Sequence, residues 1–90
     1  SKNIVDDRII SVKINIKEIV DNTFTIIDAL EKLKLVKSRG DAKRLIKSNG
    51  IKINDSDYEN NNFSLAKYCN NKNLKISVGK KKIGLINLQN

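Results

Sequence analysis

The sequence contains no histidine, proline, methionine or tryptophan, and its single cysteine is Cys69. Without histidine, and with one thiol, the chain lacks the usual ligand set of a protein zinc site. Cys69 has no histidine to act as its base and no partner for an internal disulfide, which favours an unreactive thiol and a reducing compartment. Aromatic residues are only 4% of the chain, and we expect Tyr58 and Tyr68 to anchor a core or loop rather than stack on bases. We therefore expect no metal site and no catalytic residue here.

Long apolar runs are also absent. No run of about 18 apolar residues occurs, so we expect no membrane span, and charges interrupt the opening segment SKNIVDDRII, which argues against a signal peptide. The 39% hydrophobic content supports one core. We interpret residues 1–8 as a linker remnant and 9–90 as a single domain. Because the chain starts with Ser1 and contains no methionine, we interpret it as a fragment of a longer protein.

Positive charge is abundant: the formal net charge is +8 and the sequence pI is about 9.8. Such an excess predicts a polyanionic partner, either nucleic acid or an anionic membrane. The excess could also arise without any such partner. Lysine, isoleucine and asparagine make up nearly half of the chain, as an AT-rich genome would produce, and some of the lysine could simply keep the surface solvated. The arrangement of the charges has to decide.

Hydrophobic periodicity predicts an α+β fold, and the elements can be placed approximately. Val12, Ile14 and Ile16 alternate with polar residues, the pattern of a strand buried on one face. Thr25-x-x-Asp28 is typical of a capping box at the start of a helix. We expect two packed helices against a small, mostly antiparallel sheet, with helices at about 25–35 and 39–49 and strands at about 10–17, 51–53, 74–79 and 82–88.

Two glycines predict particular backbone conformations. Gly50 follows the second helix, where a left-handed residue commonly ends the last turn. Near Gly84 the apolar phase changes from Ile83 and Leu85 to Ile86 and Leu88, and this change predicts a bulge in the last strand.

The second predicted helix has one apolar and one cationic side. Its start is marked by Ser38-x-x-Asp41, a second capping box, and its apolar side by alanine, leucine and isoleucine at helical spacing. Arg39, Lys43 and Lys47 follow each other at four-residue intervals and form one ridge, although like charges at this spacing cost a few tenths of a kcal/mol per pair. A helix that tolerates this repulsion is typical of a phosphate-binding surface, with a solvated lysine-rich face as the alternative.

The segment Val36–Asn54, VKSRGDAKRLIKSNGIKIN, resembles the RNA-binding domain named after small-subunit ribosomal protein S-four. The resemblance covers roughly residues 26–79. The closing segment LKISVGKKKI, residues 74–83, is more narrowly similar to the final hairpin of bacterial-type tyrosyl-tRNA synthetases, which carry this domain at their C-terminus. The resemblance implies a tRNA-binding domain that grips the anticodon stem and the long variable arm of tyrosine tRNA.

The resemblance also implies what this chain lacks. The two catalytic signatures of the synthetases need histidine and methionine, so no active site is expected here; the parent ligase would use ATP and Mg²⁺, and no cofactor is expected in this fragment. We expect the fragment to be monomeric, the parent to dimerise through other domains, and the location to be a bacterial cytoplasm or an organelle matrix or stroma. Alternatives are another protein with the same module (a pseudouridine synthase, a ribosome-associated heat-shock protein or a ribosomal protein) and a module for an anionic membrane or acidic protein.

The resemblance implies which residues of this chain would bind RNA. Two positions depart from the family pattern: Lys34 stands where the family commonly has glycine between the helices, and Asp55 stands where it commonly has glycine after the strand. The candidate residues are Lys37, Ser38, Arg39, Lys43, Arg44, Lys47, Lys52, Asn54, Lys80, Lys81 and Lys82.

Overall fold

The computed structural model describes residues 9–59 and 62–90, so the predicted linker remnant at residues 1–8 lies outside the described residues. The five strands form one sheet in the order β1-β5-β4-β2-β3. Only β1 and β5 pair in parallel; the other neighbours are antiparallel. This confirms the predicted small and mostly antiparallel sheet. The strands are β1 (Ile10–Asn15), β2 (Ile51–Ile53), β3 (Ser56–Asp57), β4 (Asn73–Val78) and β5 (Lys82–Gln89).

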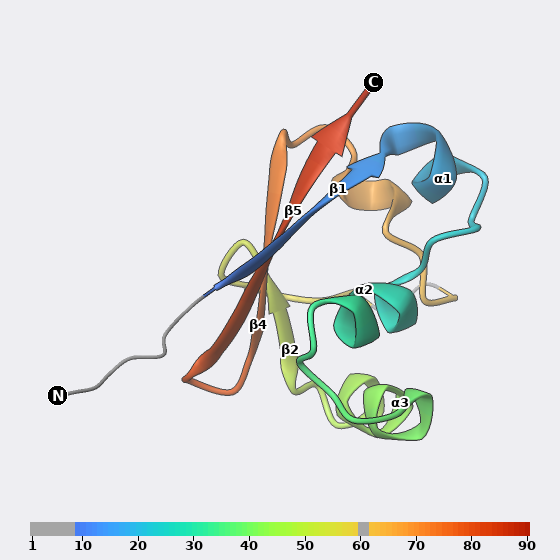
Figure 1. Ribbon diagram of the computed structural model, residues 1–90. Coiled ribbons are helices and arrows are strands. Elements are labelled where there is room, and N and C mark those ends of the chain that lie inside the picture. Colours follow the sequence, from blue (N-terminus) through green and yellow to red (C-terminus); the bar gives the residue numbers. More distant parts are fainter. Residues whose placement is uncertain (1–8, 60–61) are drawn as a thin grey trace, which may run out of the picture.

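The helices all lie on one face of the sheet (Figure 1). They are α1 (Ile16–Val20), α2 (Ile26–Lys32), α3 (Arg39–Lys47) and the short 3-10 helix η2 (Ala66–Tyr68). The core fills the space between this layer and the sheet, where the fully buried side chains include Ile26, Leu30, Ile51, Ile76 and Ile86. No helix of the described residues is long and apolar enough to cross a membrane. The α+β prediction is confirmed.

The first strand ends two residues earlier than predicted, because a helix begins there. The Asn15 side chain accepts a hydrogen bond from the Lys17 N–H at 2.8 Å, and the Glu18 carboxylate accepts one from the Asn15 N–H at 3.3 Å. These reciprocal bonds are a capping box, which starts α1 at Ile16. The alternation of apolar residues runs one residue past the strand, to Ile16 at the start of the helix, and the extension of the strand to residue 17 was wrong.

All three α-helices end in the same way, on a left-handed residue other than glycine. Asn22, Lys34 and Asn49 have φ values of 62°, 58° and 59°. After α3, the Gly50 N–H donates to the Leu45 oxygen at 2.8 Å and the Asn49 N–H to the Ile46 oxygen at 3.2 Å. This is the Schellman pattern of crossed bonds. The left-handed position is therefore Asn49, and its assignment to Gly50 was wrong by one residue.

Gly84 marks a close contact between layers rather than a bulge. The pairing of β4 with β5 advances one residue at a time from Asn73 and Asn87 to Val78 and Lys82, without an interruption. A Cβ atom on Gly84 would lie 2.8 Å from Leu33 Cδ1 and 2.9 Å from Leu33 Cβ. The glycine is needed because the end of α2 rests directly on β5, and the predicted bulge was wrong.

The polar segment between β3 and β4 is fixed by the two tyrosines, as expected. Tyr58 is buried, and its hydroxyl donates to the Ser64 carbonyl at 2.9 Å. The Tyr68 hydroxyl accepts from the Glu59 N–H at 3.1 Å, and the two rings stack with centroids 6.1 Å apart. Both tyrosines therefore anchor this segment to the core.

Candidate nucleic-acid interface

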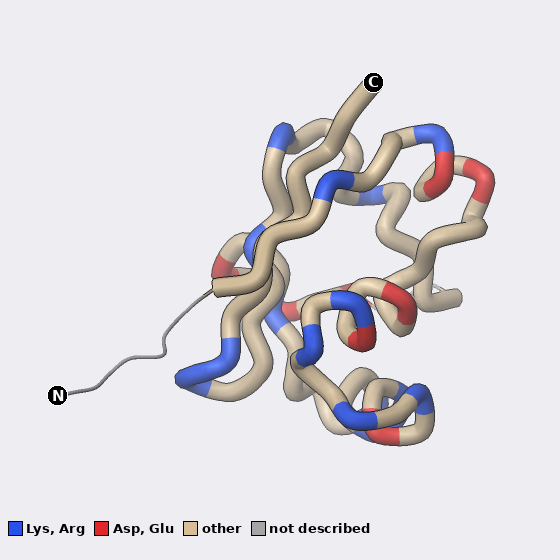
Figure 2. Tube along the Cα trace, in the orientation of Figure 1, with Lys and Arg blue, Asp and Glu red and all other residues tan. Residues whose placement is uncertain are grey.

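The described residues form an open groove of about 1000 Å³ on the helical side of the sheet. Its walls come from the segment between α2 and α3, from α3 itself, and from the hairpin that joins β4 to β5. Figure 2 shows basic residues on each of these three segments. The lining residues are Lys34, Leu35, Val36, Lys37, Asp41, Arg44, Leu45, Lys47, Ser48, Val78 and Lys82.

The apolar lining residues of the groove are buried or half-buried and its basic lining residues are exposed, so the groove has an apolar floor and a cationic rim. Five of its lining residues are lysine or arginine and only one, Asp41, is acidic. The ratio of cations to anions is higher here, five to one, than in the whole chain, which has 18 basic and 10 acidic residues, so the groove concentrates positive potential. Such a surface attracts a polyanion.

Of the predicted site residues, the structure brings four together in this groove: Lys37, Arg44, Lys47 and Lys82. Arg44 pairs with Asp41 one turn earlier on α3, and its side chain is 75% exposed. The guanidinium has five N–H donors, so it can keep this pair and still bind a phosphate.

Arg39 has a different environment. Its Nη1 atom donates to Asp28 Oδ1 at 2.9 Å and to Glu31 Oε1 at 2.8 Å, so it joins the start of α3 to α2. These two bonds raise the pKa of Arg39. Partial burial acts to raise the pKa of Asp28, but the hydrogen bonds from the Thr25 N–H and from Arg39 outweigh it, so the pKa lies below its usual 3.8. Arg39 therefore holds α3, which forms one wall of the groove, against α2.

The hydroxyl of Ser38 is also used within the protein. It accepts from the Asp41 N–H at 3.1 Å and so caps α3, as the sequence predicted. The Asp41 carboxylate, predicted to complete a capping box, pairs with Arg44. Ser38 sets where α3 begins and thereby which residues reach the groove.

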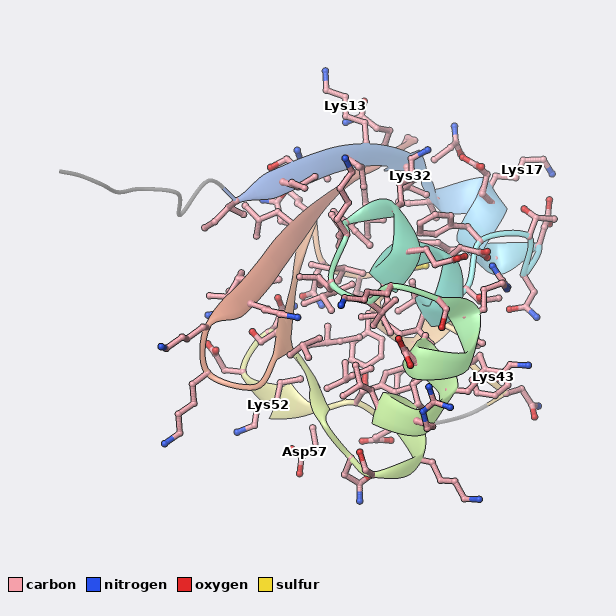
Figure 3. The ribbon with its side chains drawn as sticks, turned by 60° about the horizontal axis from the view of Figure 1, so that its bottom comes forward. Lys13, Lys17, Lys32, Lys43, Lys52 and Asp57 are labelled. Atoms are coloured by element: carbon pink, nitrogen blue, oxygen red, sulfur yellow. The ribbon has the colours of Figure 1, made fainter. Side chains whose placement is uncertain are left out.

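The remaining predicted residues lie outside the groove. Lys52 is exposed on β2 between buried Ile51 and Ile53, so it points away from the helices, and Figure 3 shows Lys52 beside β2 and Lys43 beside α3. Asn54 is left-handed at φ 52°, and its side-chain oxygen accepts from the Lys75 N–H at 2.9 Å, which ties the β2–β3 turn to β4. Two further lysines, Lys80 and Lys81, are exposed at the hairpin tip.

Sequence reasoning missed Lys34 and the floor of the groove. Lys34 was noted only as a departure from a family pattern, yet it lines the groove from a left-handed position. Its proximity to Lys37 in a short interhelical segment was the available signal. The floor residues Val36, Leu45 and Val78 lie on three separate segments, and nothing local in the sequence distinguishes them from core residues.

Among residues 9–59 and 62–90, no group of three histidine, cysteine or acidic side chains gathers as a metal site. Burial raises the pKa of the Cys69 thiol, which keeps it in the protonated, weakly nucleophilic form at neutral pH.

The chain is similar to part of two curated tyrosine–tRNA ligases. It is 36% identical over 83 residues to the tyrosine–tRNA ligase of Pelagibacter ubique (strain HTCC1062), an alignment that covers 91% of this chain and 20% of that protein. It is 37% identical over 68 residues to the enzyme of the same name from Wolbachia sp. subsp. Brugia malayi (strain TRS), covering 73% of this chain and 16% of that protein. No protein-family model matches the chain.

These similarities support a tyrosyl-tRNA synthetase-like domain. The aligned region spans about a fifth or less of the length of these relatives, so it corresponds to one part of a much longer protein. The resemblance to the S-four-like RNA-binding family stays a prediction.

Proposed function

We propose that this chain is the C-terminal tRNA-binding domain of a tyrosyl-tRNA synthetase, of the S-four-like kind, and that it docks through the cationic groove. The observation that carries the proposal is the gathering of five cations around one anion in the groove, in a chain similar to tyrosine–tRNA ligases. The partner is tRNA, with tyrosine tRNA as the first candidate.

The mechanism is electrostatic docking followed by selection of shape. Lysine and arginine side chains replace the counterions of RNA phosphates, which makes the affinity depend steeply on salt. The rigid scaffold then favours an RNA whose phosphates match the three walls of the groove. If four or five cations contact phosphates, the slope of log affinity against log salt is roughly −3 to −4.

A binding experiment tests this proposal. Fluorescence anisotropy with a labelled tRNA that has a long variable arm gives the affinity at several salt concentrations. Replacement of Arg44→Glu removes one contact and adds a repulsion, so we expect about tenfold weaker binding and a shallower slope. Lys13→Glu is the matched control, because it makes the same charge change on exposed β1, away from the groove.

The outcomes separate the alternatives. A salt-independent affinity, or equal effects of Arg44→Glu and Lys13→Glu, contradicts docking at the groove. Equal affinity for a tRNA without the long variable arm contradicts recognition of that arm. Tighter binding to ribosomal RNA fragments than to tRNA indicates that the parent is a different protein with the same RNA-binding module.

The wider protein follows from the same proposal. Tyrosine activation with ATP and Mg²⁺, and dimerisation, would belong to segments outside these 90 residues, in a bacterial cytoplasm or an organelle. In this scheme the domain contributes binding energy and orientation for the tRNA, while the chemistry takes place elsewhere in the ligase.

A further inference from the structure

The rim of the groove accounts for attraction to phosphates, but it leaves the floor unexplained. The floor consists of Leu35, Val36, Leu45 and Val78. Leu35 is buried, but the other three are only half-buried, and they expose apolar surface inside a basic groove. A surface that binds only phosphates gains nothing from such a floor, because aliphatic side chains offer no hydrogen bonds and exclude water from a charged ligand.

Resting on the proposed function, we propose that the groove holds one unpaired nucleotide of the RNA, with its base on the aliphatic floor and its neighbouring phosphates at the cationic rim. A continuous A-form duplex presents phosphates, ribose hydroxyls and base edges, with the base faces stacked inside. An unpaired nucleotide turned out of the stack presents a broad, weakly polar face between two phosphates. That combination matches a floor of leucine and valine bordered by lysine and arginine.

The position of Asp41 supports a base rather than a phosphate inside the groove. Asp41 is the acidic lining residue, and its carboxylate repels a phosphate that approaches it. A carboxylate can, however, accept hydrogen bonds from the amino or imino groups of a base. The pair with Arg44 holds this carboxylate in place and leaves the remaining guanidinium donors for a phosphate at the rim.

Charge complementarity decides between possible occupants. A second copy of this chain carries the same net charge of +8 and would be repelled. An acidic amphipathic peptide could match the charge, but it would leave no role for a carboxylate on the groove wall. The groove thus favours a nucleotide.

The test compares two stem–loop RNAs that differ in one nucleotide. In one RNA 2-aminopurine is bulged and unpaired, and in the other it is paired within the stem. We expect the bulged RNA to bind about tenfold more tightly, from the apolar area buried at the floor. Its 2-aminopurine fluorescence should rise severalfold on binding, because the base leaves the stack and no aromatic side chain is among the lining residues.

Variants separate the floor from the rim. The double variant Val36→Thr and Val78→Thr keeps side-chain volume but makes the floor polar, so the preference for the bulged RNA should fall while the salt slope stays. Lys82→Gln should weaken both RNAs alike and make the slope shallower. Circular dichroism checks folding, and Val78→Thr alone replaces the double variant if that variant unfolds.

Each result has a defined meaning. Salt-dependent binding with equal affinity for the two RNAs, or fluorescence that does not rise, overturns the nucleotide site and leaves the proposed function intact. Failure of both RNAs to bind overturns both proposals. If the floor variants bind an acidic amphipathic peptide more weakly than wild type but bind the bulged RNA as before, the floor is a binding site for a protein partner and the nucleotide site is overturned.

Discussion

At the scale of single residues, Arg39 and Arg44 show how one cationic helix serves two purposes. Arg39 bonds to two carboxylates of α2, at 2.9 and 2.8 Å, whereas Arg44 pairs only with Asp41 of its own helix and lines the groove. Both arginines lie in one helix and are exposed, so their spacing alone could not distinguish them. We interpret Arg39 as a residue that positions α3 and Arg44 as a residue that meets the ligand.

The bond between Arg39 and Asp28 leads to a pH prediction. Asp28→Asn should lower the free energy of unfolding at pH 7 by about 1 kcal/mol, since it removes the carboxylate that accepts from Thr25 and Arg39. The pKa of Asp28 is lowered in the folded state, so its contribution is present above the ordinary value of 3.8 and is lost as the pH falls through the folded pKa.

Urea unfolding at pH 7 and pH 3 measures this effect. The difference between wild type and Asp28→Asn should be smaller at pH 3 than at pH 7, because lowering the pH toward the folded pKa of Asp28 begins to remove its charge, whereas the asparagine is uncharged at both pH values. Asp57→Asn, on exposed β3, is the control and should change stability by less than about 0.5 kcal/mol. A difference of the same size at both pH values would show that the carboxylate charge is not the cause.

At the scale of elements, the turn between α2 and α3 places a left-handed residue, Lys34, in the lining of the groove. The Leu35 N–H donates to the Leu30 oxygen at 2.9 Å, which completes a Schellman motif around Lys34 at φ 58°. In this left-handed conformation, a residue with a Cβ atom is roughly 1–2 kcal/mol less favourable than glycine. The same lysine supplies a cation to the groove, so binding offers a physical reason to keep it there.

Lys34→Gly therefore should affect stability and binding in opposite directions. We expect the free energy of unfolding to rise by up to about 1 kcal/mol, because the relieved strain, roughly 1–2 kcal/mol, exceeds the extra chain entropy that glycine loses on folding, about 0.4–1 kcal/mol. The tRNA affinity should fall severalfold, because one rim cation is lost. Urea unfolding and anisotropy on the same samples measure both. Lys34→Gln is the control, because it removes the charge but keeps the backbone strain. Unchanged or tighter RNA binding in both variants would exclude Lys34 from the interface.

Local chemistry explains which elements could be predicted from the sequence. Helix starts were placed correctly at Thr25 and Ser38, because a cap acts on N–H groups within three residues. Helix ends were placed too late, because the deciding left-handed residues were Lys34 and Asn49, and neither stands out as glycine would. The groove could be predicted only in part, since its lining comes from residues more than 40 positions apart in the sequence, such as Val36 and Val78.

At the scale of the whole molecule, the helical layer and the sheet come into close contact where Leu33 lies against Gly84. Gly84→Ala should lower the free energy of unfolding by about 1–3 kcal/mol, because the added methyl group would overlap Leu33 and force the layers apart. The prediction concerns the fold alone and involves no groove residue.

Gly40→Ala is the matched substitution with the opposite sign. Gly40 lies in α3 with open space around it, since an added Cβ atom would meet only Ser38 Oγ, at 3.8 Å. The change should stabilise the protein by about 0.5–1 kcal/mol through helix propensity. Thermal and urea unfolding of the two variants measure the contrast, and equal effects at both positions would contradict the close contact at Gly84.

The parallel pairing of β1 with β5 has a consequence for how the protein is made. Ile10 lies opposite Gly84 and Asn15 opposite Gln89, so the sheet joins segments that leave the ribosome more than 70 residues apart. Contacts of such long range are slow to form, because a large loop must close first. The apolar face of α2 is synthesised long before β5 leaves the ribosome to cover it. During that interval the nascent chain avoids aggregation either by binding chaperones or through fast synthesis and folding.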